Sequence, residues 1–299
     1  SLALHYAVAL VLLATGALLG FLISWSNAHG RSALADGFYL AHTTTMLLGF
    51  VGTTVLGTLT VLWPTMLRTP MEPVAPRWTT RGLPYLVGGT ALVAACGLWP
   101  PLAGLGTLVY LGGACAVLVP AYRTARRVPP TSFATASATA SVAWFVGCVA
   151  VLGARMSLAD DAAAAREVIH SLRLPLAAGF ALQILVAALS YLTPVMLGGG
   201  PAATRATNAI MDRFAAYRVT AANACLLLAL YPGAPWQVRV VAGALAALVT
   251  SYLLAGMMLS LREVSQRKRP PRTLRTPADA DPTSDPAGHR SAQPRRGTR

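Results

Sequence analysis

The sequence predicts an all-α integral membrane protein with about eight transmembrane helices and a basic C-terminal tail. Composition is the first reason: 55% of the 299 residues are hydrophobic and 11% are charged, whereas about a quarter of the residues in a soluble domain are charged. The second is a series of apolar runs of about 20 residues, the length that crosses a bilayer core about 30 Å thick. The third is the net charge of +14. It lies between these runs and in the tail, which favours a membrane topology over nucleic-acid binding.

Eight apolar runs are separated by clusters of arginine, proline and glycine, and we expect each run to form one membrane-spanning helix. The third and fourth are divided only by Pro100 and Pro101, which fit a tight interfacial turn. We assign residues 1–261 to one transmembrane domain. The expected helices cover residues 4–25, 37–67, 82–99, 102–122, 132–154, 172–197, 214–231 and 238–261.

Arginine is distributed unequally between the two sides of this topology, and basic residues favour the cytoplasm. The outer loops hold five arginines diluted by four carboxylates. We therefore predict a multi-pass protein of the cell membrane, partnered by the lipid bilayer, with both termini cytoplasmic. The tail, 262–299, is rich in Pro, Arg, Asp and Ser and is predicted to be disordered. The predicted cytoplasmic arginines outside the tail are Arg68, Arg77, Arg81, Arg123, Arg126, Arg127, Arg205, Arg213 and Arg218.

An internal repeat emerges when the chain is shifted by 130 residues. The shift aligns 49–67 with 179–197, and seven of these nineteen positions are identical. Both segments end in the pattern Leu-[Ser/Thr]-x-Leu-x-Pro-x-Met-Leu, with the prolines at Pro64 and Pro194. Because the shift covers four expected helices, it predicts two halves of the same orientation, about 1–130 and 131–261, in a parallel 4+4 arrangement.

Small residues recur at every fourth position in the first two runs, and such stripes allow close contact between membrane helices. We expect both stripes to face other helices. They consist of Gly16, Gly20 and Ser24 in the first run, and of Thr45, Gly49, Thr53 and Gly57 in the second.

Motifs for chemistry are scarce. The four cysteines lie singly inside apolar runs, which supports neither a zinc site nor a disulfide framework. No apolar run has Asp, Glu or Lys near its centre, which argues against a proton relay built on intramembrane carboxylates. No pattern identifies a catalytic residue, so the sequence leaves open whether the protein is an enzyme.

Histidine is the exception, because His29, His42 and His170 all map to the outer half of the predicted topology. His42 lies about one turn into the second helix, and Met46 follows on the same helical face. Imidazole and thioether ligands bind haem iron and soft copper. These residues are our candidate metal or cofactor ligands. The alternative is that His42 only forms a hydrogen bond to a threonine or to a backbone carbonyl.

Two blocks of the sequence carry a resemblance to a known family. The segment 41–69, which contains His42-Thr43-Thr44-Thr45-Met46-Leu47-Leu48-Gly49, and the segment 189–202, with Arg205 and Asn223 beyond, resemble actinobacterial multi-pass membrane proteins. In that family the membrane module is often joined to cupredoxin domains of the multicopper oxidase or copper nitrite reductase type. The histidine-bearing helix is also distantly similar to the second helix of haem–copper oxidase subunit I, where the histidine holds a haem.

The departures from this family divide the functional hypotheses. The family pattern has His-x-His-x-Asn before Leu-Gly, and here only the first histidine is present, as His42, while Thr44 and Met46 occupy the other two positions. No cupredoxin copper set follows. One hypothesis is a membrane redox module that binds haem or copper near the outer face and works with a separate cupredoxin-type copper protein. The other is a non-enzymatic scaffold or small-molecule permease whose metal site has decayed, and the lost ligands favour it.

Overall fold

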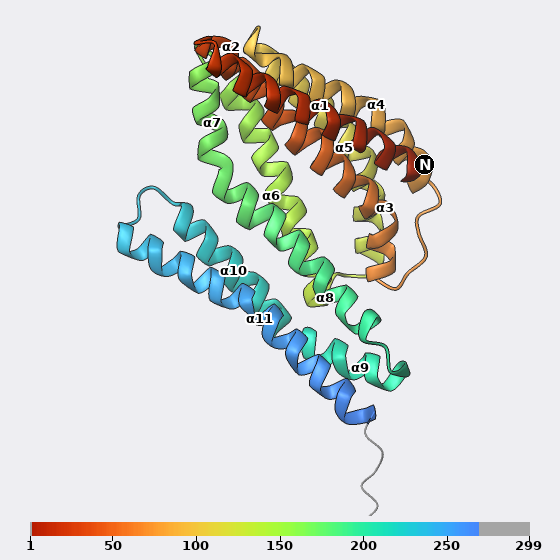
Figure 1. Ribbon diagram of the computed structural model, residues 1–299. Coiled ribbons are helices and arrows are strands. Elements are labelled where there is room, and N and C mark those ends of the chain that lie inside the picture. Colours follow the sequence, from red (N-terminus) through yellow and green to blue (C-terminus); the bar gives the residue numbers. More distant parts are fainter. Residues whose placement is uncertain (1, 269–299) are drawn as a thin grey trace, which may run out of the picture.

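The computed structural model describes residues 2–268, and all regular secondary structure in this range is helical (Figure 1). The α-helices are joined by short loops, and three shorter π or 3₁₀ segments continue the helices that precede them. The elements are α1 (Leu2–Ala28), α2 (Ser32–Thr44), η1 (Thr45–Gly52), α3 (Thr53–Met66), α4 (Ala75–Ala94), η2 (Ala95–Gly97), α5 (Pro101–Arg127), α6 (Phe133–Met156), α7 (Ala162–Leu174), η3 (Pro175–Leu182), α8 (Gln183–Leu197), α9 (Gly200–Met211), α10 (Ala215–Leu230) and α11 (Trp236–Lys268).

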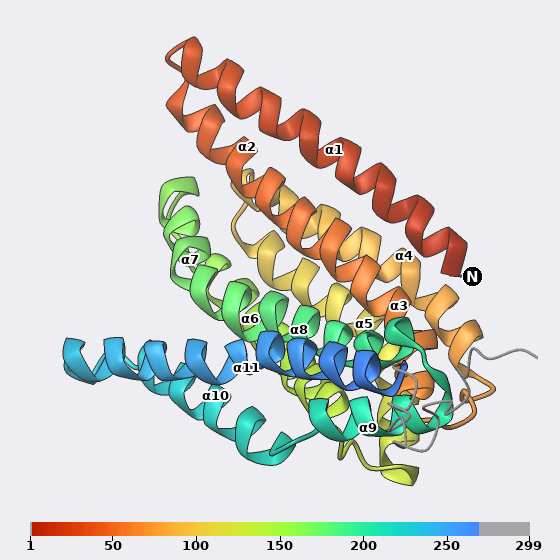
Figure 2. The same cartoon turned by 60° about the horizontal axis from the view of Figure 1, so that its bottom comes forward.

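The helices pack in the same order in the first and second parts of the chain. Helix α1 lies along α2, η1 and α3, and α4 pairs with α5. In the same way α6 lies along α7, η3 and α8, and α10 pairs with α11. Figures 1 and 2 show α1 at one edge of the assembly and the α10–α11 hairpin at the other, with α5 and α6 between them.

Two long helices carry a π-helical segment in their middle. Residues 32–66 form one continuous helix with η1 inside it, and residues 162–197 form another with η3 inside it. Both π segments have eight residues, and Thr45 and Pro175, where they begin, are 130 residues apart. A π segment disturbs the regular backbone bonding. In η1 the Leu48 carbonyl accepts a bond of 3.0 Å from the Tyr110 hydroxyl, and in η3 the Phe180 carbonyl accepts one of 2.9 Å from Ser141.

The ends of these two helices are also alike. Helix α3 ends two residues after Pro64 and α8 ends three residues after Pro194, as expected for a residue that lacks a backbone N–H. The next turn contains a left-handed residue in both cases, Arg68 with φ of 54° and Gly198 with φ of 61°. Glycine adopts this conformation freely. In an arginine it costs about 1 kcal/mol or more.

Helices α4 and α5 approach so closely that glycine is required at their contact. A Cβ at Gly89 would lie 2.5 Å from the Tyr110 nitrogen, and one at Gly82 would lie 2.7 Å from the Gly113 carbonyl oxygen. This contact fixes the position of Tyr110, which is fully buried and donates to η1.

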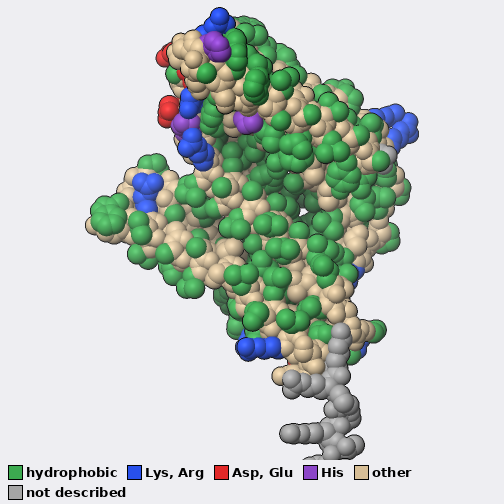
Figure 3. Space-filling view, in the orientation of Figure 1, with side chains coloured by type: hydrophobic (Ala, Val, Ile, Leu, Met, Phe, Trp, Pro, Cys, Tyr) green, Lys and Arg blue, Asp and Glu red, His purple; other side chains and the backbone are tan. Residues whose placement is uncertain are grey.

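Within residues 2–268 six helices are long and apolar enough to cross a membrane, so the prediction of eight spans is met only in part. Each predicted run does form a helix, but α4 and α10 fall short. Arg77 and Arg81 occupy the first two turns of α4, and α10 has only 16 residues and carries Arg218. On the face shown in Figure 3, hydrophobic side chains cover most of the middle, whereas Arg, Lys, Asp and Glu lie mainly toward the ends.

The first residues of the predicted tail are helical. Helix α11 continues past 261 to Lys268, and Arg267 bonds Glu263 one turn earlier at 2.7 Å. Such a pair stabilises an exposed helix end, and hydropathy does not reveal it. The rest of the predicted disordered tail, 269–299, lies outside the described residues.

Candidate functional site

His42 lies in α2 against the glycine stripe of α1. Its Nδ1 is 2.8 Å from the Gly16 carbonyl oxygen. A carbonyl oxygen can only accept, so Nδ1 is the donor, and the neutral tautomer with this bond leaves a lone pair on Nε2. A Cβ at Gly20 would lie 3.3 Å from the His42 ring, so the glycines of α1 provide the space that this side chain fills.

Met46 occupies the next position on the same helical face. Its sulfur lies 2.5 Å from where a Cβ at Gly16 would be, so the thioether packs into the same stripe as His42. Gly16 and Gly20 of the first stripe therefore face another helix, as predicted, and so do Gly49 and Gly57 of the second. Ser24 is the exception: it is exposed, whereas Ser26 is fully buried.

The other two predicted ligands have separate environments. His29 is exposed, its Nδ1 bonds the Trp25 carbonyl at 2.8 Å, and its ring packs on the Trp25 ring. His170 lies in α7, 3.4 Å from the Glu167 carboxylate and edge-on to Tyr39.

Within residues 2–268 no three His, Cys, Asp or Glu side chains come close enough together to hold a metal ion. The donor set around His42 thus offers one imidazole whose Nδ1 is oriented by a carbonyl, an arrangement that metal-binding histidines use, and one thioether. Within the described residues the structure does not bring His29, His42 and His170 together as ligands of one copper ion.

Sequence reasoning missed His5, which is fully buried in α1 and packs over Gly57 of α3. It also missed an amide cluster between α6, α8 and α10. Asn223 exchanges hydrogen bonds with Gln183, at 2.9 and 3.2 Å, and accepts one of 2.7 Å from the Trp144 indole. Asn223 also donates to the Val219 carbonyl. The amides satisfy one another, so this cluster holds helices together.

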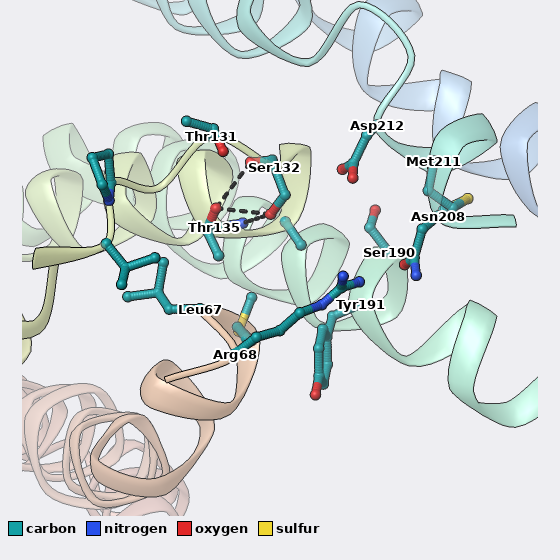
Figure 4. Close-up of a pocket in the computed structure, with 14 residues that line it drawn as sticks. Leu67, Arg68, Thr131, Ser132, Thr135, Ser190, Tyr191, Asn208, Met211 and Asp212 are labelled. Atoms are coloured by element: carbon teal, nitrogen blue, oxygen red, sulfur yellow. Dashed lines mark hydrogen bonds between the residues drawn. The ribbon is translucent and has the colours of Figure 1, made fainter. Parts of the chain in front are cut away.

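A polar cavity of about 290 Å³ opens at the arginine-rich end of the molecule, where the two parts of the chain meet (Figure 4). Its walls come from the end of α3, the start of α6, α8, α9 and the α9–α10 turn. The lining residues are Met66, Leu67, Arg68, Val128, Pro129, Thr131, Ser132, Ala134, Thr135, Ser190, Tyr191, Asn208, Met211 and Asp212.

Three donors face this cavity without a partner among the described residues. Ser190 is only 3% exposed, and its buried hydroxyl forms no hydrogen bond within residues 2–268. Neither the Arg68 guanidinium nor the Asn208 amide has a hydrogen bond or ion pair within residues 2–268. Figure 4 shows the three side chains converging from the turn after α3, from α8 and from α9. A buried hydroxyl without a partner is costly, and it marks a place where a ligand can bind.

Asp212 forms the opposite wall. One of its oxygens accepts a bond of 2.8 Å from the Phe133 N–H, at the start of α6. Burial raises the pKa of Asp212, while this bond and the nearby charges of Arg68 and Arg218 act against the rise. Arg218 is itself buried between the rings of Phe133 and Tyr252 and donates to the Met211 carbonyl at 2.8 Å.

The sequence contained a partial signal for this cavity. In the sequence, Arg68 contributed to the predicted charge asymmetry between the two sides of the membrane. Ser190 contributed to the repeated motif. Pro194 lies four residues after Ser190 and cannot donate to its carbonyl, so that carbonyl lacks its helical donor. A serine one turn before a proline in an apolar run is the local signal for this part of the site.

Comparison of the chain with known protein families, with characterised proteins and with solved structures found no match. The function is therefore argued from the site alone.

Proposed function

We propose that this chain is a non-enzymatic small-molecule permease of the cell membrane, built from two tandem halves, with the polar cavity as its solute site. The observation that carries the proposal is the unbonded Ser190 hydroxyl, which faces a cavity also lined by Arg68, Asn208 and Asp212. Polar sites between repeated halves are typical of secondary transporters.

The parallel 4+4 duplication is supported by several features at one offset. The bounds of α2, of η1 and of the start of α3 recur 130 residues later in α7, η3 and α8. The left-handed residues Arg68 and Gly198 have the same spacing. Asp36 and Arg166, also 130 residues apart, form an ion pair of 2.7 Å between α2 and α7. A coincidence of apolar composition does not account for matching π segments and turns.

The orientation follows from the distribution of charge. The cavity lies at the end that carries the loops after α3, α5 and α8, where the predicted cytoplasmic arginines are concentrated. The cavity therefore opens toward the cytoplasm, and both termini lie on that side. At the opposite end the Asp36–Arg166 pair and the packing of Arg166 over Tyr39 hold α2 against α7. A cavity that opens toward the cytoplasm, with α2 and α7 held together at the other end, corresponds to the inward-facing state of an alternating-access cycle.

Exchange of solute across a membrane tests the permease proposal. Proteoliposomes loaded with unlabelled amino acids, sugars or organic acids are given the labelled solute outside, and protein-dependent counterflow of at least one solute is expected. Ser190→Trp fills the cavity and should abolish the exchange, whereas Leu192→Trp, on an exposed part of α8, should not. Wild-type vesicles that exchange none of these solutes faster than empty vesicles would overturn the proposal.

A second candidate function is a membrane redox module, favoured by the bond between His42 Nδ1 and the Gly16 carbonyl. His42 would hold haem or copper through Nε2, and the bound group would supply electron transfer to a cupredoxin-type copper protein. The test is the absorbance spectrum and copper content of protein expressed with both cofactors available. A Soret band or stoichiometric copper that is lost in His42→Ala supports this candidate, and their absence in the wild type refutes it.

A further inference from the structure

The charges around the polar cavity define the chemical class of its solute. We infer that the cavity binds a small zwitterion of the α-amino-acid type, with the carboxylate at Arg68, Ser190 and Asn208 and the ammonium at Asp212. This inference rests on the proposed permease function and names its substrate class.

The donor side of the cavity fits a carboxylate. Arg68 presents a planar guanidinium that can bind both oxygens of a carboxylate, and Ser190 and Asn208 add a hydroxyl and an amide donor. None of the three has a hydrogen bond or ion pair within residues 2–268. Arg68 also keeps a left-handed backbone where the corresponding residue of the other half, Gly198, needs no side chain. Strain of this kind is typical of functional positions.

The opposite wall fits an ammonium group. Asp212 uses one oxygen to cap α6 through the Phe133 N–H, and a carboxylate has further acceptor positions for a second donor. Figure 4 shows the Asp212 carboxylate across the cavity from Arg68. A solute with only a negative charge would meet repulsion from Asp212, and one with only a positive charge would meet Arg68. A zwitterion satisfies both walls.

The remaining walls set the size and polarity of the solute. Met66, Leu67, Val128 and Met211 supply apolar surface beside the charged groups. A volume of about 290 Å³ accommodates an amino acid with an aliphatic side chain.

Binding of three matched probes to the purified full chain tests the inference. Leucine is the zwitterion, 4-methylpentanoate lacks its ammonium, and leucinamide lacks its carboxylate. Isothermal titration calorimetry in detergent should show leucine binding at least tenfold more tightly than either analogue. Arg68→Gln should weaken leucine and 4-methylpentanoate but leave leucinamide unaffected or improved, and Asp212→Asn should do the reverse.

A pair of serine variants separates binding from structure. Ser190 has no hydrogen bond to lose, so Ser190→Ala should keep the melting temperature and weaken leucine binding about tenfold. Ser141 is buried and bonds the Phe180 carbonyl, so Ser141→Ala should lower the melting temperature and leave the leucine affinity unchanged.

The outcomes distinguish this inference from the proposed function. If counterflow occurs with other solutes while leucine binds no better than its two analogues, the zwitterion assignment is wrong and the permease proposal stands. If leucine binds with the expected selectivity but no solute is exchanged, the site is correct and the permease function is wrong. Equal leucine affinity in wild type and Ser190→Ala would place the site elsewhere.

Discussion

Replacing Gly89 by alanine gives a demanding test of the packing that supports the site. The new Cβ would lie 2.5 Å from the Tyr110 nitrogen and 2.6 Å from the Gly106 carbonyl oxygen. Ordinary contacts are about 3.5 to 4 Å, so α4 and α5 must separate by about 1 Å. Overpacking of this kind costs about 1 to 3 kcal/mol. The displaced backbone belongs to Tyr110, whose hydroxyl bonds the π segment η1, so the strain spreads from the α4–α5 contact into the long helix.

Gly88 supplies the matched control because a Cβ there meets nothing within 4 Å. Gly88→Ala should stabilise the protein by up to about 1 kcal/mol through helix propensity alone. The two neighbouring variants should therefore differ by about 1 to 4 kcal/mol in unfolding free energy. Circular dichroism during titration with a denaturing detergent measures this difference. Equal stability of the two variants would refute the described contact between α4 and α5.

Three further changes probe the hydrogen bonds and the buried charge. Tyr110→Phe should cost about 1 to 2 kcal/mol, measured in the same titration, because the Leu48 carbonyl loses the donor that comes from α5; no loss of stability would contradict this. His42→Ala should cost about 1 to 3 kcal/mol by removing the hydrogen bond to the Gly16 carbonyl and the packing of the ring against Gly20, and under the permease proposal it leaves the absorbance spectrum unchanged. For Asp212 the folded pKa lies above its ordinary value of 3.8, so its contribution to stability declines as pH rises above that value. Asp212→Asn should remove this decline, and melting curves at about pH 4 and pH 7 that shift as in the wild type would show that another group is responsible.

Hydropathy predicted the helices because a helix that crosses the bilayer core needs about 20 apolar residues. It did not distinguish α4 and α10, where arginine and short length weaken the apolar run, from the six described helices that are long and apolar enough to cross a membrane. The sequence did not predict the π segments either, because their carbonyls accept from donors on other helices, such as Tyr110 and Ser141. The repeated motif did indicate where the two long helices end, through the missing N–H of Pro64 and Pro194.

The site was harder to predict than the helices. His42 and Met46 were recognised as a pair on one face, and the structure gives them a common neighbour in Gly16. The cavity has no local signature because it brings together Arg68, Ser190 and Asp212 from three separate parts of the chain. Their chemistry depends on tertiary packing, which leaves one hydroxyl unbonded and sets a carboxylate opposite a guanidinium.

The accessibility of residue 190 tests the central claim most directly. In a variant whose four native cysteines are replaced by alanine, Ser190→Cys should react with a charged, membrane-impermeant thiol reagent in inside-out vesicles and not in right-side-out vesicles. Leucine should slow the reaction, because it occupies the same cavity. The account is contradicted if the cysteine is labelled from the outer side, or if it is labelled from neither side although a cysteine at the exposed Arg126 is labelled in inside-out vesicles.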